Sequence, residues 1–301
     1  MSGPSEAPAR PLPERGLSVP ALRPLPARGA VPTHRPLPAR GPLPARASGR
    51  GAWVANATLV GRDDLTAAIA IFRVRPDDGP PAFLPGQYLS LGFVVDGAVV
   101  QRPYSTASGP GSAELEFLIR RVPGGTFTPA LWAARPGARV SLGRAKGVFA
   151  LRPDDDRAHL FIATGTGLAP FVAMLGAMGD RPRRPGAVVV HGVAHVAELA
   201  YGDRLAAAHR AGGIRYVPTI SRPADPGNAG WSGASGRVTE VLPRLFADGA
   251  LDSSATVAYL CGNPAMIESA TALLADLGLP PGAIVSERYW ASDPAGSPAR
   301  T

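Results

Sequence analysis

The sequence predicts a two-domain protein in which an antiparallel β-barrel precedes a parallel α/β sheet, with a disordered segment before both. From Trp53 to about residue 152, short β-rich runs are separated by Gly, Pro and Asp turns, a spacing typical of an antiparallel barrel. After about Pro153, strand-like and helix-like segments alternate, which indicates a parallel sheet. The opening residues repeat a Pro- and Arg-rich phrase that suits neither a helix nor an interior strand.

The opening segment, residues 1 to 52, contains variants of the phrase Arg-Pro-Leu-Pro-Ala-Arg-Gly. Frequent proline removes backbone donors and fixes an extended geometry, so we expect a disordered, polyproline-like tail. Its first 50 residues hold eight arginines against two glutamates, a balance of +6 out of the formal +8 of the chain. The charged tail has no interleaved aromatic residues, which argues against nucleic-acid binding. It is either dispensable or a basic tether for an acidic partner or a proline-recognising domain.

Composition excludes other classes of protein. No stretch approaches the roughly 20 apolar residues needed to cross a bilayer, and the first residues lack the apolar run of a secretory signal. We therefore expect a cytoplasmic protein with no membrane partner. The single cysteine, Cys261, excludes an internal disulfide and a four-cysteine iron-sulfur or zinc site. We expect no metal site, and any redox cofactor should be organic.

The elements of each domain follow in order as apolar runs bounded by turn residues. Predicted barrel strands cover Val54 to Val60, Ile69 to Val74, Tyr88 to Val94, a strand pair around Val94 to Val100, Leu115 to Arg120, and Arg139 to Leu142. Predicted strands of the second domain cover His159 to Ala163, Ala187 to His191, Arg215 to Ile220 and Thr256 to Leu260, with a final edge strand from Ser286 to Trp290. Predicted helices cover Pro170 to Met178, Glu198 to His209, Thr239 to Phe246 and Pro264 to Leu277.

Three motifs of the barrel offer groups for a phosphorylated aromatic ligand. The segment from Arg102 to Ser108 supplies a guanidinium for phosphate, an aromatic ring for stacking and hydroxyl donors within one extended turn. A Pro-Gly-Gln-Tyr turn precedes it at 85–88, and a glycine-rich turn at 124–128 leads into a helix. Free backbone N–H groups at such a turn suit a pyrophosphate. The candidate residues are Arg102, Pro103, Tyr104, Ser105, Thr106, Gly125, Thr126, Phe127 and Thr128.

The second domain has two glycine-containing turns directly after predicted strands. The first is Thr164, Gly165, Thr166, Gly167, Leu168, Ala169, Pro170, and the second is Cys261, Gly262, Asn263, Pro264. Glycines allow close backbone approach, and Pro170 suits the first turn of a helix whose N-terminus faces ligand phosphates. Asn263 is suited to cap the following helix, with Pro264 as its first residue. Proline replaces the last glycine of the usual Gly-x-Gly-x-x-Gly dinucleotide fingerprint.

In this order and spacing, these motifs and the closing run Ser286 to Trp290 resemble the bacterial ferredoxin/flavodoxin-NADP reductase family. The resemblance covers residues 53 to 290 and implies a six-stranded Greek-key barrel that binds FAD, residues 53–152. It implies a doubly wound parallel sheet that binds NADP, residues 153–290. Tails at 1–52 and 291–301 flank the two domains, and the second tail departs from the family pattern by continuing past the aromatic end.

The resemblance also implies roles for single residues. It assigns Arg102 to the FAD phosphate, Tyr104 to the flavin face, and Ser105 to the vicinity of the flavin nitrogen that exchanges hydride. Cys261 would border the nicotinamide, and Glu287 would lie near the nicotinamide and flavin as the proton route. Further implied cofactor contacts are Leu118, Ile119 and Arg120 along the flavin edge, Gly125, Thr126 and Thr128 at the pyrophosphate, and Tyr289 and Trp290 covering FAD.

The implied function is hydride transfer between NADPH and FAD, and single-electron transfer between FAD and ferredoxin or flavodoxin, by a monomer. A reductase of the same fold could instead serve an oxygenase, a free flavin or a ferric acceptor. An alternative of another class is a non-catalytic nucleotide-binding or Pro-rich scaffold protein. Arg222 and Arg237 stand where NADPH-using members place arginines for the 2′-phosphate, while Ala194 stands where another arginine is usual. We therefore expect a moderate preference for NADPH.

Overall fold

The computed structural model describes residues 55–152, 155–179 and 186–289, all within one compact unit that spans residues 51–301. The predicted tails, residues 53 and 54 at the start of the first predicted domain, and Trp290 lie outside the described residues. In the part of the chain that is described, no helix is long and apolar enough to cross a membrane.

The first domain is an antiparallel six-stranded barrel, and this confirms the prediction. Its strands are β1 (Ala57–Thr66), β2 (Ile69–Pro76), β3 (Tyr88–Val95), β4 (Ala98–Ser105), β5 (Leu115–Arg120) and β6 (Arg139–Leu142), with a short helix α1 (Phe127–Ala133). The strand order is β4-β3-β6-β1-β2-β5. The two edges meet just beyond β4, where the Ala107 N–H donates to the Glu116 carbonyl at 2.8 Å. Alternate side chains such as Phe72, Leu89 and Phe117 fill the interior, as the twofold period of a strand requires.

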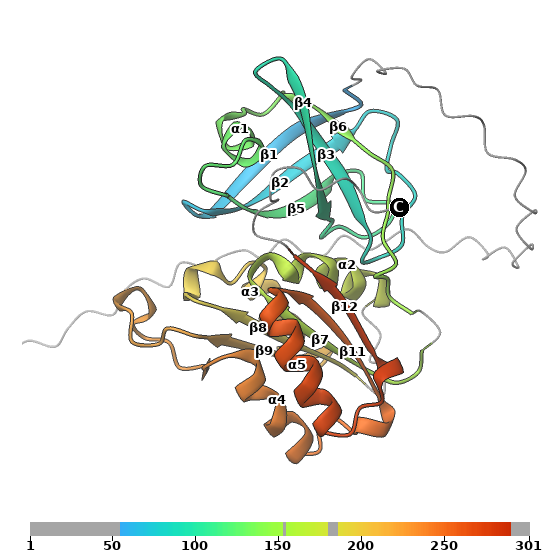
Figure 1. Cartoon of the computed structure of the whole chain (residues 1–301), viewed down its shortest axis with the longest axis vertical. Helices are drawn as coiled ribbons and strands as arrows, with labels where there is room; N and C mark the ends of the chain where they lie inside the picture. The colour runs from blue at the N-terminus through green and yellow to red at the C-terminus, as the bar shows by residue number, and fades with distance from the viewer. Residues whose placement is uncertain (1–54, 153–154, 180–185, 290–301) are drawn as a thin grey trace, which may run out of the picture. The chain divides into compact units, whose positions relative to one another are not determined.

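The second domain is a parallel six-stranded sheet with helices on both faces, also as predicted (Figure 1). Its strands are β7 (Ala158–Thr164), β8 (Ala187–Val193), β9 (Ile214–Ile220), β10 (Ala234–Ser235), β11 (Thr256–Gly262) and β12 (Ile284–Arg288). Its helices are α2 (Ala169–Met178), α3 (Gly202–Arg210), α4 (Val238–Ala247) and α5 (Pro264–Asp276), with single 3-10 turns η1 (Gly165–Leu168), η2 (Val196–Glu198), η3 (Pro226–Asn228), η4 (Ser253–Ala255) and η5 (Pro281–Ala283).

The order of the parallel strands determines where a ligand can bind. The order is β10-β9-β8-β7-β11-β12, so the chain runs outward on one side of β7 and then returns to its other side at β11. In open parallel sheets, ligands bind beyond the carboxyl ends of the strands at such a point of reversal. The two turns predicted to bind a dinucleotide follow β7 and β11 directly.

Two boundaries differ from the sequence predictions for identifiable reasons. The helix predicted from Glu198 begins only at Gly202, because Tyr201 has a left-handed backbone (φ 55°) that interrupts the helical path. Arg102 to Ser105, predicted in a turn, are instead the last residues of β4 and pair with β3. The motif is therefore held by a strand ladder, which fixes the direction of each side chain.

Candidate functional site

Three predicted catalytic side chains from distant parts of the chain meet in one cluster. Ser105, at the end of β4, donates a hydrogen bond from Oγ to Glu287 Oε2 at 3.2 Å. Glu287 lies in β12 directly opposite Cys261 of β11. Tyr289 follows β12, and its N–H donates to the Gly262 carbonyl at 2.9 Å. The barrel and the parallel sheet thus contribute neighbouring groups to the same cluster.

Burial determines the proton chemistry of this cluster. It raises the pKa of Glu287 to about 7, and the hydrogen bond from Ser105 opposes this only in part. The pKa of the Cys261 thiol is raised well above its usual value, by burial first and by the nearby Glu287 carboxylate second. Burial first, and then the neighbouring Cys261 and Glu287, raise the pKa of Tyr289 as well. Glu287 is therefore the member of this cluster that can gain or lose a proton near neutral pH, while Cys261 stays a neutral thiol.

The barrel brings two of its predicted motifs together. The Tyr104 ring lies 5.8 Å from the ring of Phe127, the first residue of α1. Arg102 has no ion pair within the described residues, and its guanidinium donates to the neighbouring Gln101 carbonyl at 2.9 Å. A half-buried ring, a cation free to meet a phosphate and the start of a helix are the parts that a phosphorylated aromatic ligand requires.

Several predicted contact residues have side chains that are already used inside the protein. The Thr128 hydroxyl accepts a bond from the Val122 N–H at 2.8 Å and so closes the glycine-rich turn. The buried Thr106 hydroxyl accepts from the Ser108 N–H at 3.0 Å. Leu118 and Ile119 are buried in hydrophobic cores. Because these four side chains are already bonded or buried inside the protein, a ligand at these positions would meet backbone groups. Other predicted residues that remain at least partly accessible include Pro103, Gly125, Thr126, Thr164, Gly165, Thr166, Asn263 and Pro264.

The glycine turns after β7 and β11, which form the predicted dinucleotide crevice, are packed closely together. A Cβ atom on Gly167 would lie 2.3 Å from the Cys261 carbonyl oxygen, and one on Gly262 would lie 2.2 Å from Thr164 Oγ1. Gly262 also has a positive φ of 138°, which L side chains rarely adopt. Thr164 Oγ1 in turn accepts from the Asn263 N–H at 3.1 Å. Glycine is therefore required at both turns.

Each turn leads into a helix whose start is as predicted. Asn263 caps α5 by accepting bonds from the N–H groups of Ala265 at 2.9 Å and Met266 at 3.3 Å. Pro264 is the first residue of α5, and Pro170 lies in the first turn of α2. Proline has no N–H group, so it leaves none unpaired in the first turn. The other N–H groups of that turn point out of the N-terminal end of each helix, toward the two glycine turns.

Two residues that support the crevice were not predicted for this role. His191 is fully buried, and its Nε2 lies 3.1 Å from the carbonyl of Gly165. Burial lowers the pKa of His191 to about 4, so a neutral ring holds the start of the glycine turn. Arg120, predicted only for the flavin edge, forms an ion pair with Glu198 at 3.4 Å and approaches Gly165 from the barrel. Neither contact has a signal in the sequence, because each joins a strand to a 3-10 turn that lies far away along the chain.

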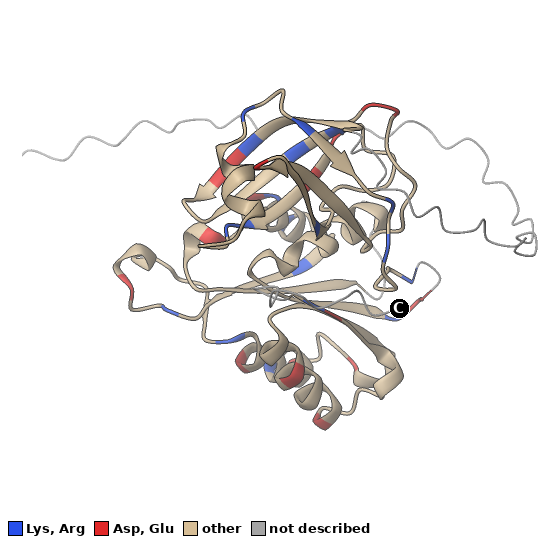
Figure 2. Ribbon diagram, turned by 45° about the horizontal axis from the view of Figure 1, so that its top comes forward, with Lys and Arg blue, Asp and Glu red and all other residues tan. Residues whose placement is uncertain are grey.

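The two arginines predicted for the 2′-phosphate come to the same edge of the sheet. Ser235 of β10 pairs with Ile220 of β9, so Arg222 and Arg237 both follow the carboxyl ends of adjacent strands. Ala194 follows β8 beside them, since the Ser221 N–H donates to the Val193 carbonyl at 2.9 Å. Both arginines are exposed and form no ion pair within the described residues. In Figure 2 the loop beyond β9 carries separate segments of positive and of negative charge.

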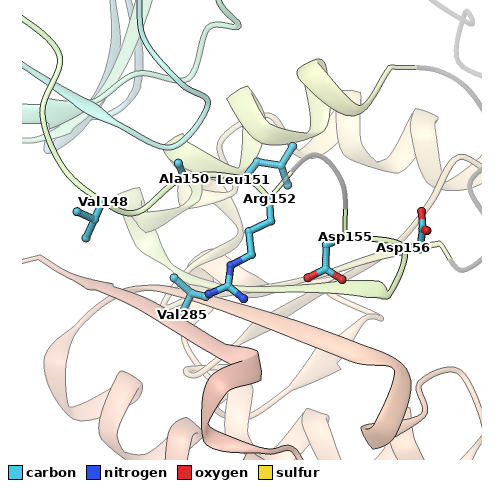
Figure 3. Close-up of a pocket in the computed structure, with 7 residues that line it drawn as sticks. All are labelled: Val148, Ala150, Leu151, Arg152, Asp155, Asp156 and Val285. Atoms are coloured by element: carbon cyan, nitrogen blue, oxygen red, sulfur yellow. The ribbon is translucent and has the colours of Figure 1, made fainter. Parts of the chain in front are cut away.

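A surface pocket of about 590 Å³ lies apart from these residues. Figure 3 shows the Arg152 side chain extending toward Val285, with Asp155 at its side. None of the predicted site residues lines this pocket. Within the described residues, no group of three or more His, Cys, Asp or Glu side chains could hold a metal ion.

Comparisons with known proteins match both halves of the chain. Residues 56–150 match the oxidoreductase FAD-binding domain, and residues 161–272 match the oxidoreductase NAD-binding domain. The flavodoxin/ferredoxin-NADP reductase of Escherichia coli K12 is 31% identical over 230 residues, which cover 69% of this chain and 88% of that protein. The toluate 1,2-dioxygenase electron transfer component of Pseudomonas putida is 35% identical over 216 residues, 70% of this chain and 60% of that protein.

Solved structures of such reductases also resemble this chain. A ferredoxin NADP+ reductase from Neisseria gonorrhoeae, solved with bound FAD and NADP, aligns with a TM-score of 0.66 and 27% identity. The alignment covers 77% of this chain and 97% of that structure.

Proposed function

Because the chain belongs to the ferredoxin-NADP reductase family of FAD- and NAD-binding oxidoreductases, we propose that it carries hydride between NADPH and FAD and single electrons between FAD and ferredoxin or flavodoxin. The observation that carries this proposal is the cluster of Ser105, Glu287 and Cys261, in which the flavin domain meets the nicotinamide domain. We assign residues 53–152 to the first domain and 153–290 to the second.

The residues present fit both cofactors. Arg102 supplies a cation without an ion pair among the described residues, and Tyr104 supplies a half-buried ring next to the start of α1. At the crevice, Gly167 and Gly262 allow the turns after β7 and β11 to pack against each other, which brings their backbone groups together at the carboxyl ends of the two strands. These features suit the phosphates and ring of FAD in the barrel and a dinucleotide at the sheet.

When bound, FAD supplies the hydride acceptance and the single-electron release. The protein positions the reacting rings and excludes water from them. Ser105 donates to Oε2 and so orients the Glu287 carboxyl, which can hold or release a proton near neutral pH. The neutral thiol of Cys261 packs beside it and adds no charge. Arg222 and Arg237 would bind the ribose 2′-phosphate of NADPH, with Tyr289 and Trp290 covering the flavin.

A second candidate differs in the electron acceptor. The Pseudomonas putida relative is named as the electron transfer component of toluate 1,2-dioxygenase, which favours an oxygenase partner as the alternative. These 301 residues contain one cysteine, too few for a four-cysteine cluster, so electrons would leave directly from FAD in either case. A cytoplasmic, monomeric state remains a prediction from the sequence.

Rapid-mixing kinetics test the proposal. The purified yellow protein is reduced anaerobically by NADPH or by NADH, and the reduced protein is then mixed with ferredoxin, flavodoxin or an oxygenase component. We expect faster reduction by NADPH and fastest reoxidation by ferredoxin or flavodoxin. Fastest reoxidation by the oxygenase component would support the alternative acceptor. A purified protein with no flavin absorbance would refute both and favour a non-catalytic nucleotide-binding or scaffold protein.

The coenzyme preference has its own test. The double change Arg222→Ala and Arg237→Ala should raise the KM for NADPH by about tenfold or more and leave the KM for NADH nearly unchanged, because two charge-assisted phosphate contacts are lost. Ala194→Arg should increase the preference. Arg244→Ala, which removes an exposed arginine from α4, serves as the control and should change neither KM. Equal use of both coenzymes by the unmodified enzyme would contradict the assignment.

A further inference from the structure

Two loops of the barrel join to form one exposed apolar tip. Val148 is fully exposed, and Leu84 is 59% exposed. The Gln87 side chain ties their loops together, because its Nε2 donates to the Gly147 carbonyl at 2.9 Å and its Oε1 accepts from the Leu84 N–H at 2.9 Å. Two large apolar side chains held in water on joined loops are typical of a contact surface.

This tip lies beside the proposed reaction site. A Cβ atom on Gly147, the residue before Val148, would lie 3.6 Å from Glu287 Oε1. Val285, two residues before Glu287 in β12, lines the pocket of about 590 Å³ together with Val148. Figure 3 shows Val148 on the chain segment that leads to Ala150, and Val285 on β12. A protein that covers Val148 is therefore brought next to the Glu287 carboxyl, at the proposed reaction site.

Positive charge surrounds the tip. The exposed cations of this segment are Arg144, Lys146 and Arg152. None of them forms an ion pair within the described residues. Of the carboxylates that line the pocket, Asp155 pairs with Arg157 at 2.6 Å and Asp156 is exposed. Even when the charge of Asp154, which lies outside the described residues, is counted with Asp156, the three cations are in excess. The surface therefore favours an acidic partner.

The charge of the whole chain supports the same kind of partner. The first 50 residues add a balance of +6, which attracts an acidic protein from a distance. A second copy of this chain is disfavoured, because a twofold interface here would place the cations of one copy against the same cations of the other. An acidic protein with apolar side chains at the centre of its contact surface fits both the tip and its surroundings.

We propose that this surface is where the protein electron acceptor docks, with the tip and the pocket binding its apolar side chains and the cations attracting its acidic rim. The inference rests on the proposed function, in which single electrons pass from FAD to such a protein. Apolar contacts at the centre of an interface carry most of its affinity, whereas charges at the rim mainly increase the rate of association. The residues of this docking surface are Leu84, Arg144, Lys146, Val148 and Arg152.

The test compares full-length variants in the NADPH-driven reduction of purified ferredoxin, purified flavodoxin and the dye dichlorophenolindophenol. The dye is small and needs no docking surface, so it reports only the coenzyme and flavin steps. Val148→Ser and Leu84→Ser remove apolar contacts, and Lys146→Gln removes one charge. Flavin content shows whether each variant is folded, and the basic opening segment is the same in all of them.

Two control variants change the same residue types elsewhere. Val99→Ser is the control for the tip, because Val99 is also exposed, at 43%, and pairs with Val94. Val94 is six residues along β3 from Tyr88, which Gly147 approaches, so this control lies about 20 Å from the tip. Arg210→Gln removes an exposed charge at the end of α3.

Val148→Ser and Leu84→Ser should each lower kcat/KM for the protein acceptor by about three- to tenfold, at low and at high salt. Lys146→Gln should lower it by about two- to fivefold at low salt, and this loss should fade at about 0.5 M salt because the charge is screened. The rate with the dye should stay at the wild-type value in all three variants. Val99→Ser and Arg210→Gln should follow the wild type with every acceptor.

A loss in Val148→Ser and Leu84→Ser no larger than that in Val99→Ser would overturn this inference alone. Equal losses with the dye and the protein acceptor would show a structural defect and would also overturn it. A dimeric wild type in gel filtration that Val148→Ser converts to a monomer would assign the surface to a second copy instead. A wild type that reduces the dye but neither protein would overturn the proposed acceptor together with this inference.

Discussion

Glu287 should control the pH dependence of both flavin reduction and stability. Burial raises the pKa of its carboxyl from 4.5 to about 7. This difference of about 2.5 units corresponds to roughly 3 kcal/mol, at about 1.36 kcal/mol per unit. The folded protein binds this proton more tightly than the unfolded chain does. The resulting stabilisation is fully present below pH 4.5 and is lost as the pH rises through about 7.

Glu287→Gln removes the ionisation and keeps an oxygen that can accept the Ser105 hydrogen bond. Across this pH range the wild type should lose up to about 3 kcal/mol relative to the variant, or roughly 6 to 12 °C in Tm for a protein of this size. The variant should therefore melt higher than the wild type in alkaline buffer and about equally in acid. Its rate of flavin reduction should also lack the inflection near neutral pH that we expect for the wild type.

Thermal melting of the FAD-saturated proteins and anaerobic rapid-mixing reduction by NADPH, each across the pH range, measure these two effects. Glu268→Gln is the control, because this glutamate is exposed on α5 and pairs with Arg288 at 3.5 Å. It should follow the wild type in both assays. A Tm difference between Glu287→Gln and the wild type that stays constant with pH, or an unchanged inflection in the variant, would refute the assignment of the proton to this carboxyl.

Three further predictions test separate parts of the site. Ser105→Ala should slow flavin reduction while FAD stays bound, and Arg102→Ala should instead release FAD, as flavin absorbance after gel filtration would show; wild-type reduction rates in both would contradict the flavin assignment. Gly167→Ala places a Cβ atom 2.3 Å from the Cys261 carbonyl oxygen and should cost about 1 to 3 kcal/mol in denaturant unfolding; unchanged stability would contradict this packing. Tyr201→Phe removes a 3.0 Å hydrogen bond to the Glu116 carboxylate of the barrel and should cost about 1.5 to 3 kcal/mol in denaturant unfolding; wild-type stability would show that this bond does not stabilise the fold.

Local sequence determined the fold class and most of the motifs. Alternating apolar residues specify strands, and glycine, proline and asparagine at the ends of strands specify turns and helix starts, because these preferences depend on each residue and its near neighbours. The cap at Asn263 and the strand from Leu115 to Arg120 were predicted for this reason and lie where expected. The break at Tyr201 had no such signal, because a left-handed non-glycine residue is held by its tertiary surroundings.

Only the tertiary structure decided which residues meet. Ser105 and Glu287 are 182 positions apart, and their hydrogen bond exists because the end of β4 reaches β12. The sequence also did not predict that the Thr128 hydroxyl bonds within its own turn. Nor did it predict that His191 supports Gly165. The physical reason is that hydrogen bonds and burial between distant segments depend on the packing of whole elements. Periodicity and turn chemistry specify those elements but not the partners of their side chains.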